Sequence, residues 1–200
     1  MQVIATGLAH QFARRPPLFH DLNFTLLPRR VYALTGPSGS GKSTLLNILA
    51  GWLEPSAGRV VREGVNSVAW VFQNPHGVPA RSVEDHVALP LLAQGLDHRA
   101  ARADARLRLA RVGLESLARA PYRELSGGEA QRLMLARGIA RSPSLLLVDE
   151  PTAQLDVRTA ESVNEVIAGV ATEGTIIVVA THDPRTRDVC TDVIDLAAGP

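Results

Sequence analysis

The stretch of sequence that decides the fold reads Gly36-Pro37-Ser38-Gly39-Ser40-Gly41-Lys42-Ser43. It matches G-x-x-x-x-G-K-[ST], the pattern of a loop whose backbone cradles phosphate groups. The apolar run Val31–Thr35 before it predicts a buried strand. The segment Lys42–Ala50 after it predicts a helix that carries Leu45, Leu46 and Leu49 on one face and stops at Gly51. A strand, this loop and a helix in that order are the context that a phosphate-binding loop requires.

The residue types in the loop fit the chemistry of a nucleoside triphosphate. Glycines allow successive backbone N–H groups to point at one anion, and the following helix presents its positive N-terminal end to the same phosphates. Lys42, the only lysine in the chain, is predicted to reach the β- and γ-phosphates and to act in catalysis, while the Ser43 hydroxyl is a ligand for Mg²⁺. The predicted ATP-binding residues of this segment are Gly36, Pro37, Ser38, Gly39, Ser40, Gly41, Lys42, Ser43 and Thr44.

Three further apolar runs predict strands that are buried on both faces: Val68–Phe72, Leu145–Val148 and Ile176–Ala180. Such runs, separated by helical stretches, indicate a mainly parallel sheet in an α/β fold. The segment from Pro75 to Arg123 is rich in Ala, Arg and Leu and predicts a mainly helical insertion. We therefore expect one P-loop NTPase domain over residues 1–200, with a core of residues 1–74 and 126–200 and a helical insertion at residues 75–125.

Two carboxylates follow the strand Leu145–Val148. A P-loop nucleotidase needs an acidic side chain at the end of a neighbouring strand to support Mg²⁺, and Asp149 is placed for that role. Glu150 is placed to polarise the water that attacks the γ-phosphate. The pair predicts hydrolysis of the bound nucleotide.

Arginines crowd the predicted insertion at Arg99, Arg102, Arg106, Arg108 and Arg111. One interpretation is a patch for nucleic acid or lipid headgroups. The other, which we favour, is a solvated helix face with Leu107, Leu109 and Val112 turned inward. The net charge of +1 also argues against a chain built to coat nucleic acid.

The composition suggests where the protein works. No apolar run approaches the roughly 20 residues that cross a bilayer, and the first residues do not form a signal peptide. The single cysteine, Cys190, cannot form an internal disulfide, fits a reducing compartment, and is expected to be a small buried or half-buried side chain. Work at a membrane would then require another chain to hold the protein there.

The segment Leu125-Ser126-Gly127-Gly128-Glu129 resembles the signature sequence of ABC ATPases. Ser126 and Glu129 form a capping-box pattern that predicts a helix start, and the two glycines leave its N–H groups open to an anion. Because the phosphate-binding loop already holds one γ-phosphate, we expect Ser126, Gly127, Gly128 and Glu129 to bind the ATP of another subunit. Two subunits facing head to tail would bury two ATP molecules between them.

The resemblance covers nearly the whole chain and implies further site residues. Gln73 matches the Q-loop glutamine, which contacts Mg²⁺ and water and faces the membrane partner. The segment Pro151–Asp156 matches the D-loop, with Asp156 across the dimer interface, and His182 matches the switch histidine at the γ-phosphate. Phe12 resembles the aromatic residue that stacks on adenine. A small antiparallel β part near the N-terminus is implied as well.

The resemblance implies an ATPase that hydrolyses MgATP in a dimer, most simply a homodimer, to power an integral membrane permease at the cytoplasmic face of the cell membrane. The segment Val71–Leu92 looks most like the subgroup that serves lipoprotein release and macrolide efflux. The main alternative is a non-transport ABC ATPase that acts on DNA or ribosomes. Such DNA-organising relatives carry long coiled coils, and the insertion here shows no sustained heptads. We therefore expect no nucleic-acid partner. A regulatory module without turnover would lack Glu150 or His182, and both are present.

Overall fold

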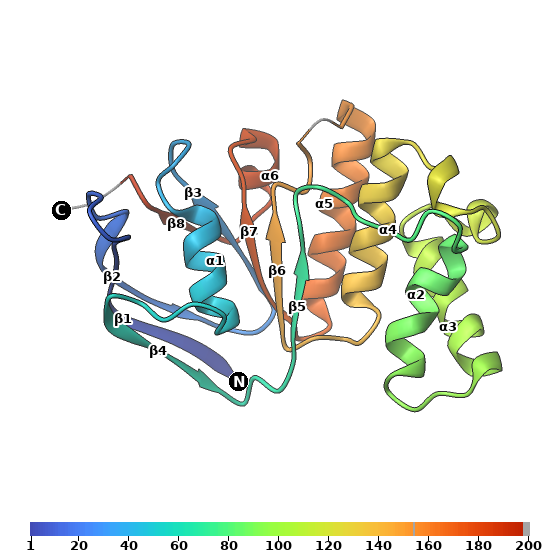
Figure 1. Cartoon of the computed structure of the whole chain (residues 1–200), viewed down its shortest axis with the longest axis horizontal. Coiled ribbons are helices and arrows are strands. Elements are labelled where there is room, and N and C mark those ends of the chain that lie inside the picture. The colour runs from blue at the N-terminus through green and yellow to red at the C-terminus, as the bar shows by residue number, and fades with distance from the viewer. Residues whose placement is uncertain (154, 198–200) are drawn as a thin grey trace.

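The computed structural model describes residues 1–153 and 155–197. The described residues form an antiparallel sheet, a parallel sheet and the helices that cover them (Figure 1). The antiparallel sheet has the order β2-β1-β4, with β1 at Gln2–His10, β2 at Phe19–Leu26 and β4 at Ala57–Glu63. The parallel sheet has the order β5-β6-β7-β3-β8, with bounds Val68–Val71, Leu145–Asp149, Ile176–Ala180, Arg30–Thr35 and Asp192–Asp195.

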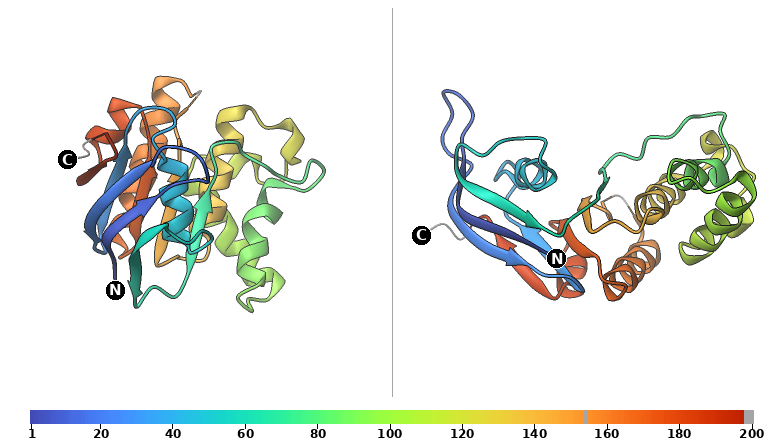
Figure 2. Two further views of the ribbon diagram at one scale, coloured as in Figure 1. Left: turned by 60° about the vertical axis from the view of Figure 1, so that its left-hand side comes forward. Right: turned by 90° about the horizontal axis from the view of Figure 1, so that it is seen from below.

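The helices are α1 (Lys42–Ala50), α2 (Val83–Leu92), α3 (His98–Arg111), α4 (Gly127–Ile139), α5 (Val157–Thr172) and α6 (Pro184–Asp188). Figures 1 and 2 show α1 between the two sheets, α4 and α5 beside the other face of the parallel sheet, and α2 and α3 at the far end of the molecule. Two short 3-10 turns, Glu115–Leu117 and Tyr122–Glu124, lie between α3 and α4.

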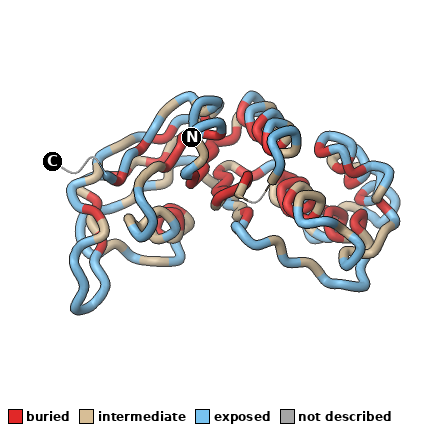
Figure 3. The backbone as a smooth tube through the Cα atoms, turned by 90° about the horizontal axis from the view of Figure 1, so that it is seen from above, coloured by how far each residue is buried: buried red, intermediate tan, exposed pale blue. Residues whose placement is uncertain are grey.

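The parallel strands are apolar without interruption because both of their faces are covered. Leu145 and Leu147 of β6 pack into the core that contains α1 and the antiparallel sheet, whereas Leu146 and Val148 pack into the core that contains α2 to α5. Figure 3 shows that the buried residues lie on the sides of the helices and strands that face these two cores. The predicted α/β class, parallel sheet and N-terminal antiparallel part are confirmed.

Most expected elements lie where the sequence placed them. Helix α1 has the predicted bounds and ends at Gly51, whose φ of 80° is the left-handed conformation that glycine adopts at low cost. The expected strand Val68–Phe72 is one residue shorter in the structure, and Leu145–Val148 is one residue longer. The division into a core and an insertion at residues 75–125 stays a prediction. Gln154, in the expected D-loop, lies outside the described residues.

The expected helical stretch does not begin at Pro75. Residues 75–82 form an irregular loop, and the first helix of the region starts at Val83 after the N-cap Ser82, whose side chain accepts a hydrogen bond from the Asp85 N–H at 3.1 Å. Two prolines and a glycine in this short segment, Pro75, Gly77 and Pro79, explain the difference. Proline lacks the backbone N–H of a helix interior and restricts the residue before it.

The inward-facing set expected for α3 is wrong at one position. Leu109 and Val112 are fully buried as expected, but Leu107 is 68% exposed. The buried stripe of α3 instead consists of Ala101, Ala105 and Leu109, spaced four residues apart. Because Leu107 lies two residues from Leu109, it faces the opposite side of the helix.

The arginines of α3 are largely engaged by carboxylates of the same chain. Arg102 pairs with Asp85 at 3.0 Å and Arg106 with Glu84 at 3.2 Å, which ties α3 to α2. The other pairs are Arg108 with Asp104 at 3.1 Å and Arg111 with Glu173 at 2.8 Å. Four of the five arginines named above are therefore paired with carboxylates, which agrees with a solvated helix face.

Candidate nucleotide site

The site lies at the carboxyl edge of the parallel sheet. The loop after β3 carries Lys42, the residue after β6 is Glu150, the loop after β5 begins near Gln73, and the segment after β7 contains His182. In parallel sheets the carboxyl ends of all strands meet at one edge, which is why residues far apart in the sequence converge there.

The loop between β3 and α1 is shaped by glycines in conformations that other residues avoid. Gly36, Gly39 and Gly41 have φ values of 142°, 81° and 99°. A Cβ atom at Gly41 would also lie 3.0 Å from the Cβ of Leu18. The Lys42 ammonium donates to the Gly36 carbonyl at 2.8 Å and to the Pro37 carbonyl at 3.2 Å, so it lies folded over the loop.

A hydroxyl and a carboxylate meet beside the loop. The Ser43 hydroxyl donates to Asp149 Oδ2 at 2.9 Å. Burial raises the pKa of the Asp149 carboxyl, the neighbouring Glu150 raises it further, and Ser43 and Lys42 act in the opposite direction. Two hard oxygen donors that converge in this way fit a Mg²⁺ ion, which prefers oxygen ligands and keeps positions for phosphate and water.

Within residues 1–153 and 155–197, no group of three or more His, Cys, Asp or Glu side chains gathers as a metal site. Ser43 and Asp149 supply two oxygen donors, and a Mg²⁺ ion here would complete its coordination with phosphate and water oxygens.

Glu150 and His182 form a second pair. His182 Nδ1 lies 2.8 Å from Glu150 Oε2, and the His182 backbone N–H donates to the same oxygen at 3.4 Å. The Glu150 backbone has the left-handed φ of 47°, and its N–H donates to the Ala180 carbonyl at 2.9 Å. The Glu150 side chain is 11% exposed and that of His182 is 70% exposed. A buried carboxylate held by an accessible imidazole suits proton transfer.

An open cavity of about 700 Å³ contains most of these groups. The predicted residues that line it are Phe12, Ser38, Gly39, Gly41, Lys42, Ser43, Thr44, Gln73, Asp149, Glu150 and His182. The other predicted loop residues, Gly36, Pro37 and Ser40, shape the loop but do not line the cavity. Its size is that of a small-ligand pocket.

Two residues that the sequence did not indicate also line this cavity, Arg15 and Leu18. Both come from the turn between β1 and β2, where the Arg15 N–H donates to the Phe12 carbonyl at 3.0 Å. The same turn presents Phe12, whose half-exposed ring meets His10 edge-on at 4.8 Å. In the sequence, the one indication that this turn belongs to the site was the basic pair Arg14-Arg15 close to the aromatic residue Phe12.

The remaining predicted residues lie outside the cavity. Ser126 caps α4 as expected: its hydroxyl accepts from the Glu129 N–H at 3.3 Å, and Glu129 accepts from the Ser126 N–H at 2.8 Å. The Ser126 N–H and the Ser126 hydroxyl, which also donates to the Glu129 carboxylate at 2.8 Å, hold the pKa of Glu129 below its usual value. Asp156 caps α5 by accepting from the Thr159 N–H at 3.1 Å. Within one chain, these residues do not join Lys42 and Glu150.

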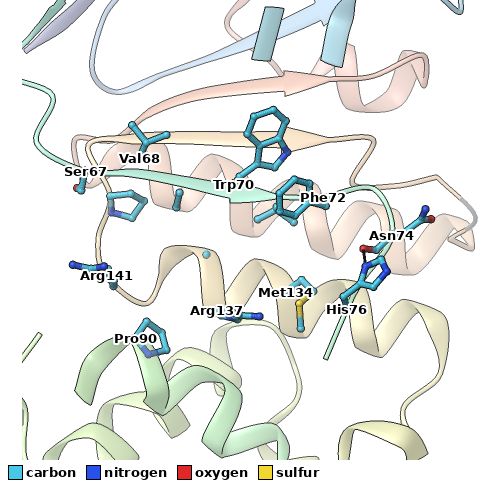
Figure 4. A pocket seen from close by; sticks show the side chains of 14 residues that line it. Ser67, Val68, Trp70, Phe72, Asn74, His76, Pro90, Met134, Arg137 and Arg141 are labelled. Carbon is cyan, nitrogen blue, oxygen red and sulfur yellow. Dashed lines mark hydrogen bonds between the residues drawn. The ribbon is translucent and has the colours of Figure 1, made fainter. Parts of the chain in front are cut away.

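A second hollow of about 320 Å³ runs along the free edge of β5 toward α4 (Figure 4). Trp70 and Phe72 stack with their ring centres 5.2 Å apart, and Trp52 adds a third ring 4.9 Å from Trp70. Across the hollow, Figure 4 shows Arg137 and Arg141 near the end of α4. The groove is therefore apolar with two basic groups, and its Phe72 side leads directly to Gln73.

Two further expectations can be examined in the part of the chain that the structure describes. None of its helices has both the length and the apolar character needed to span a bilayer. Cys190 is half-buried, as expected for a small side chain of this kind, and burial raises the pKa of its thiol to about 11.

Comparisons of the sequence with known families and proteins agree with one another. The profile described as ABC transporter matches residues 19–153. A lipoprotein-releasing system ATP-binding protein, LolD, from Shewanella sp. (strain MR-4) is 41% identical over 169 residues, which cover 76% of this chain and 73% of that protein. A putative hemin import ATP-binding protein, HrtA, from Staphylococcus haemolyticus is 35% identical over 194 residues, covering 90% of this chain and 88% of that protein.

Solved structures share the fold. The dimeric ATP-binding cassette MJ0796, in a post-hydrolysis state with ADP and Pi, superposes with a TM-score of 0.85 at 26% identity, covering 96% of this chain and 93% of that one. The protein cbiO1 from Clostridium perfringens, part of the cbiONQ transporter complex, gives a TM-score of 0.86 at 27% identity, covering 96% and 83%.

Proposed function

This chain belongs to the ABC transporter family as an ATP-binding subunit that hydrolyses ATP to power a transporter, and we propose that it binds MgATP in the cavity at the carboxyl edge of its parallel sheet. One observation carries the assignment of the site. Lys42, Asp149, Glu150 and His182, which come from three separate parts of the sequence, line a single cavity.

Each group has a distinct task in binding. The backbone N–H groups of residues 38–44 and the Lys42 ammonium hold the β- and γ-phosphates. Ser43, Asp149 and Gln73 hold Mg²⁺, which supplies positive charge against the phosphate oxygens when it is bound. Phe12 packs against the adenine ring. The folded-over position of Lys42 keeps its charge beside the loop that receives the anion.

Glu150 and His182 act on the water and the γ-phosphate. The Glu150 carboxylate orients the water and takes its proton, and its backbone hydrogen bond to β7 keeps it aimed at the cavity. His182 holds that carboxylate at 2.8 Å and is accessible enough to reach the terminal phosphate. Glu150 and His182 therefore handle the proton of the attacking water, whereas the phosphate-binding loop holds the nucleotide.

The site is completed by a second copy of the chain. The segment Ser126–Glu129 presents a capped helix end that does not line the chain's own cavity, and Asp156 also lies outside it. A two-fold partner would bring these residues to the γ-phosphate of the opposite site. The dimeric form of the similar cassette MJ0796 supports this arrangement.

The permease is proposed to dock in the groove along β5. Trp70 and Phe72 offer apolar contact area, and Arg137 and Arg141 favour a segment that carries acidic residues. Because the groove adjoins Gln73, contact there can be transmitted to the Mg²⁺ ligands. We place the subunit at the cytoplasmic face of the cell membrane, and the similarity to LolD favours lipoprotein release as the process that it powers.

Nucleotide binding tests the site. Lys42→Ala removes the only ammonium in the cavity and should abolish measurable ATP binding in titration calorimetry, while Arg59→Ala on exposed β4 serves as a control that should bind normally. Unchanged ATP affinity in Lys42→Ala would count against the assigned site.

The partner requires a separate experiment. Tagged Glu150→Gln protein, solubilised from membranes in mild detergent with MgATP, should retain an integral membrane permease that mass spectrometry identifies. Recovery of ribosomes or DNA-bound proteins with no membrane-embedded chain would favour the non-transport alternative and leave the ATPase site in place.

A further inference from the structure

The loop that follows Gln73 is fastened to the helical part of the chain. The Tyr122 hydroxyl donates to the Pro75 carbonyl at 2.9 Å, and the Tyr122 N–H donates to the Arg81 carbonyl at 2.9 Å. Gly77 lies directly against the Tyr122 ring, where a Cβ atom would collide. The centre of the loop is held by two further bonds, from the Val78 N–H to His86 Nε2 at 2.9 Å and from the Arg123 N–H to the Pro79 carbonyl at 3.1 Å.

The bonds of His86 define its protonation state. Its Nε2 accepts the Val78 N–H, so that nitrogen carries no proton. Its Nδ1 lies 2.7 Å from the Ser82 carbonyl, which can only accept, so that nitrogen carries the proton. The ring is therefore neutral. It is 3% exposed and packs 5.4 Å from the ring of Tyr122.

The surroundings favour this neutral form. Burial lowers the pKa of His86, and the positive charges of Arg137 on α4 and Arg81 in the loop lower it further. The Ser82 carbonyl and the Asp85 carboxylate act in the opposite direction. Tyr122 is the titratable group on the remaining side, and burial raises its pKa, so it stays uncharged. Because the folded-state pKa of His86 is lowered, the bond to Val78 is intact near neutral pH. It weakens as the pH falls below the ordinary histidine value of about 6.5.

We propose that His86 is a positioning residue that, in its neutral form, fastens the loop carrying Gln73 to the helical part of the chain at Val78, and that protonation of its Nε2 loosens the stretch between Pro75 and Pro79. A protonated Nε2 is a donor facing the donor N–H of Val78, so the bond cannot persist. The consequence for Gln73 rests on the proposed function. The Tyr122 hydroxyl still holds Pro75, so the loosened stretch would hold Gln73 less firmly at the cavity, and hydrolysis would fall while the phosphate-binding loop kept its affinity for ATP.

The hydrogen bond can be measured without nucleotide, by NMR amide exchange of Val78 in the full chain, corrected for intrinsic exchange, between pH 7.5 and pH 5.5. We expect protection of Val78 to fall on the order of tenfold on acidification. His86→Gln, whose side-chain oxygen can accept the Val78 N–H at any pH, should keep protection and lose its pH dependence. His86→Phe should lack protection throughout, and His98→Gln, the same substitution at an exposed position of α3, should behave as wild type.

Protection of Val78 that is independent of pH in the wild type, or unchanged in His86→Phe, would overturn the proposal. Amide exchange of Val78 is measured without ATP, so its result does not depend on whether the chain hydrolyses ATP. The proposal for His86 and the proposed nucleotide site can therefore be refuted independently of each other.

A functional measurement then distinguishes positioning from general structural support. At pH 7.5, His86→Phe should hydrolyse saturating MgATP several-fold more slowly than wild type but bind ATP as tightly, and His86→Gln should restore turnover. A parallel loss of ATP affinity, or no rescue by glutamine, would contradict a positioning role.

Discussion

Substitution of Glu150 by glutamine tests the chemistry of the site with the least structural change. The carboxylate is almost buried and is held 2.8 Å from His182 Nδ1, and its backbone is fixed by the hydrogen bond to Ala180. Glutamine keeps the shape and can still contact His182, but it cannot take a proton from water. A positioned general base contributes about 10²- to 10⁴-fold to a rate, which corresponds to about 2.7–5.5 kcal/mol of transition-state stabilisation.

We therefore expect single-turnover ATP hydrolysis by Glu150→Gln to fall by about 10²- to 10⁴-fold, with ATP affinity retained because residues 36–44 are unchanged. Glu165→Gln, the same substitution on the exposed side of α5, is the matched control and should keep full turnover. Hydrolysis by Glu150→Gln at the wild-type rate would refute the assigned role. Loss of ATP binding in this variant would show that the carboxylate supports the fold or the phosphate site instead.

Three other predictions follow from burial and titration. Leu109→Ala in the buried stripe of α3 should lower the free energy of unfolding by about 2–5 kcal/mol in urea denaturation. Leu107→Ala, at a mostly exposed position, should change it by less than about 0.5 kcal/mol, and equal losses would contradict the packing of α3. Cys190, with a pKa of about 11, should react with a thiol reagent at pH 8 about 100-fold more slowly in the folded than in the urea-unfolded chain, and comparable rates would show it to be accessible. Glu129 has a lowered folded-state pKa, so its contribution to stability is present above pH 4.5 and is lost as the pH falls through that lowered value. Thermal melts between pH 6 and pH 3 should accordingly show a smaller acid loss in Glu129→Gln than in wild type, and identical pH profiles would contradict the capping bonds.

Much of the fold could be predicted because the decisive signals are local. The strand before the phosphate-binding loop, the helix Lys42–Ala50 and the capping box at Ser126 each follow from residues close together in the sequence. The uninterrupted apolar runs predicted strands buried on both faces, and β6 and β7 confirm this. The convergence of Asp149, Glu150 and His182 could be expected because all three lie at the carboxyl ends of parallel strands.

Features that depend on contacts between distant segments could not be predicted. Leu107 is a large apolar residue but is exposed, whereas the smaller residues Ala101 and Ala105 are buried together with Leu109. The contact between α3 and α2 favours small side chains at those two positions. Arg15 and Leu18 reach the cavity only through the folding of the β1–β2 turn. The partner of His86 is a backbone N–H in an irregular loop, which leaves no pattern in the sequence.

In the proposed dimer, two copies of the chain enclose the nucleotide between the phosphate-binding loop of one copy and the Ser126–Glu129 segment of the other. Sedimentation velocity of Glu150→Gln, with and without MgATP, tests it most directly. We predict a monomer without nucleotide and a dimer with MgATP, and we predict that Gly127→Asp, which places a negative charge at the helix end, prevents the dimer while ATP still binds. A variant that binds MgATP and remains monomeric at all protein concentrations, or a dimer unaffected by Gly127→Asp, would contradict the shared site.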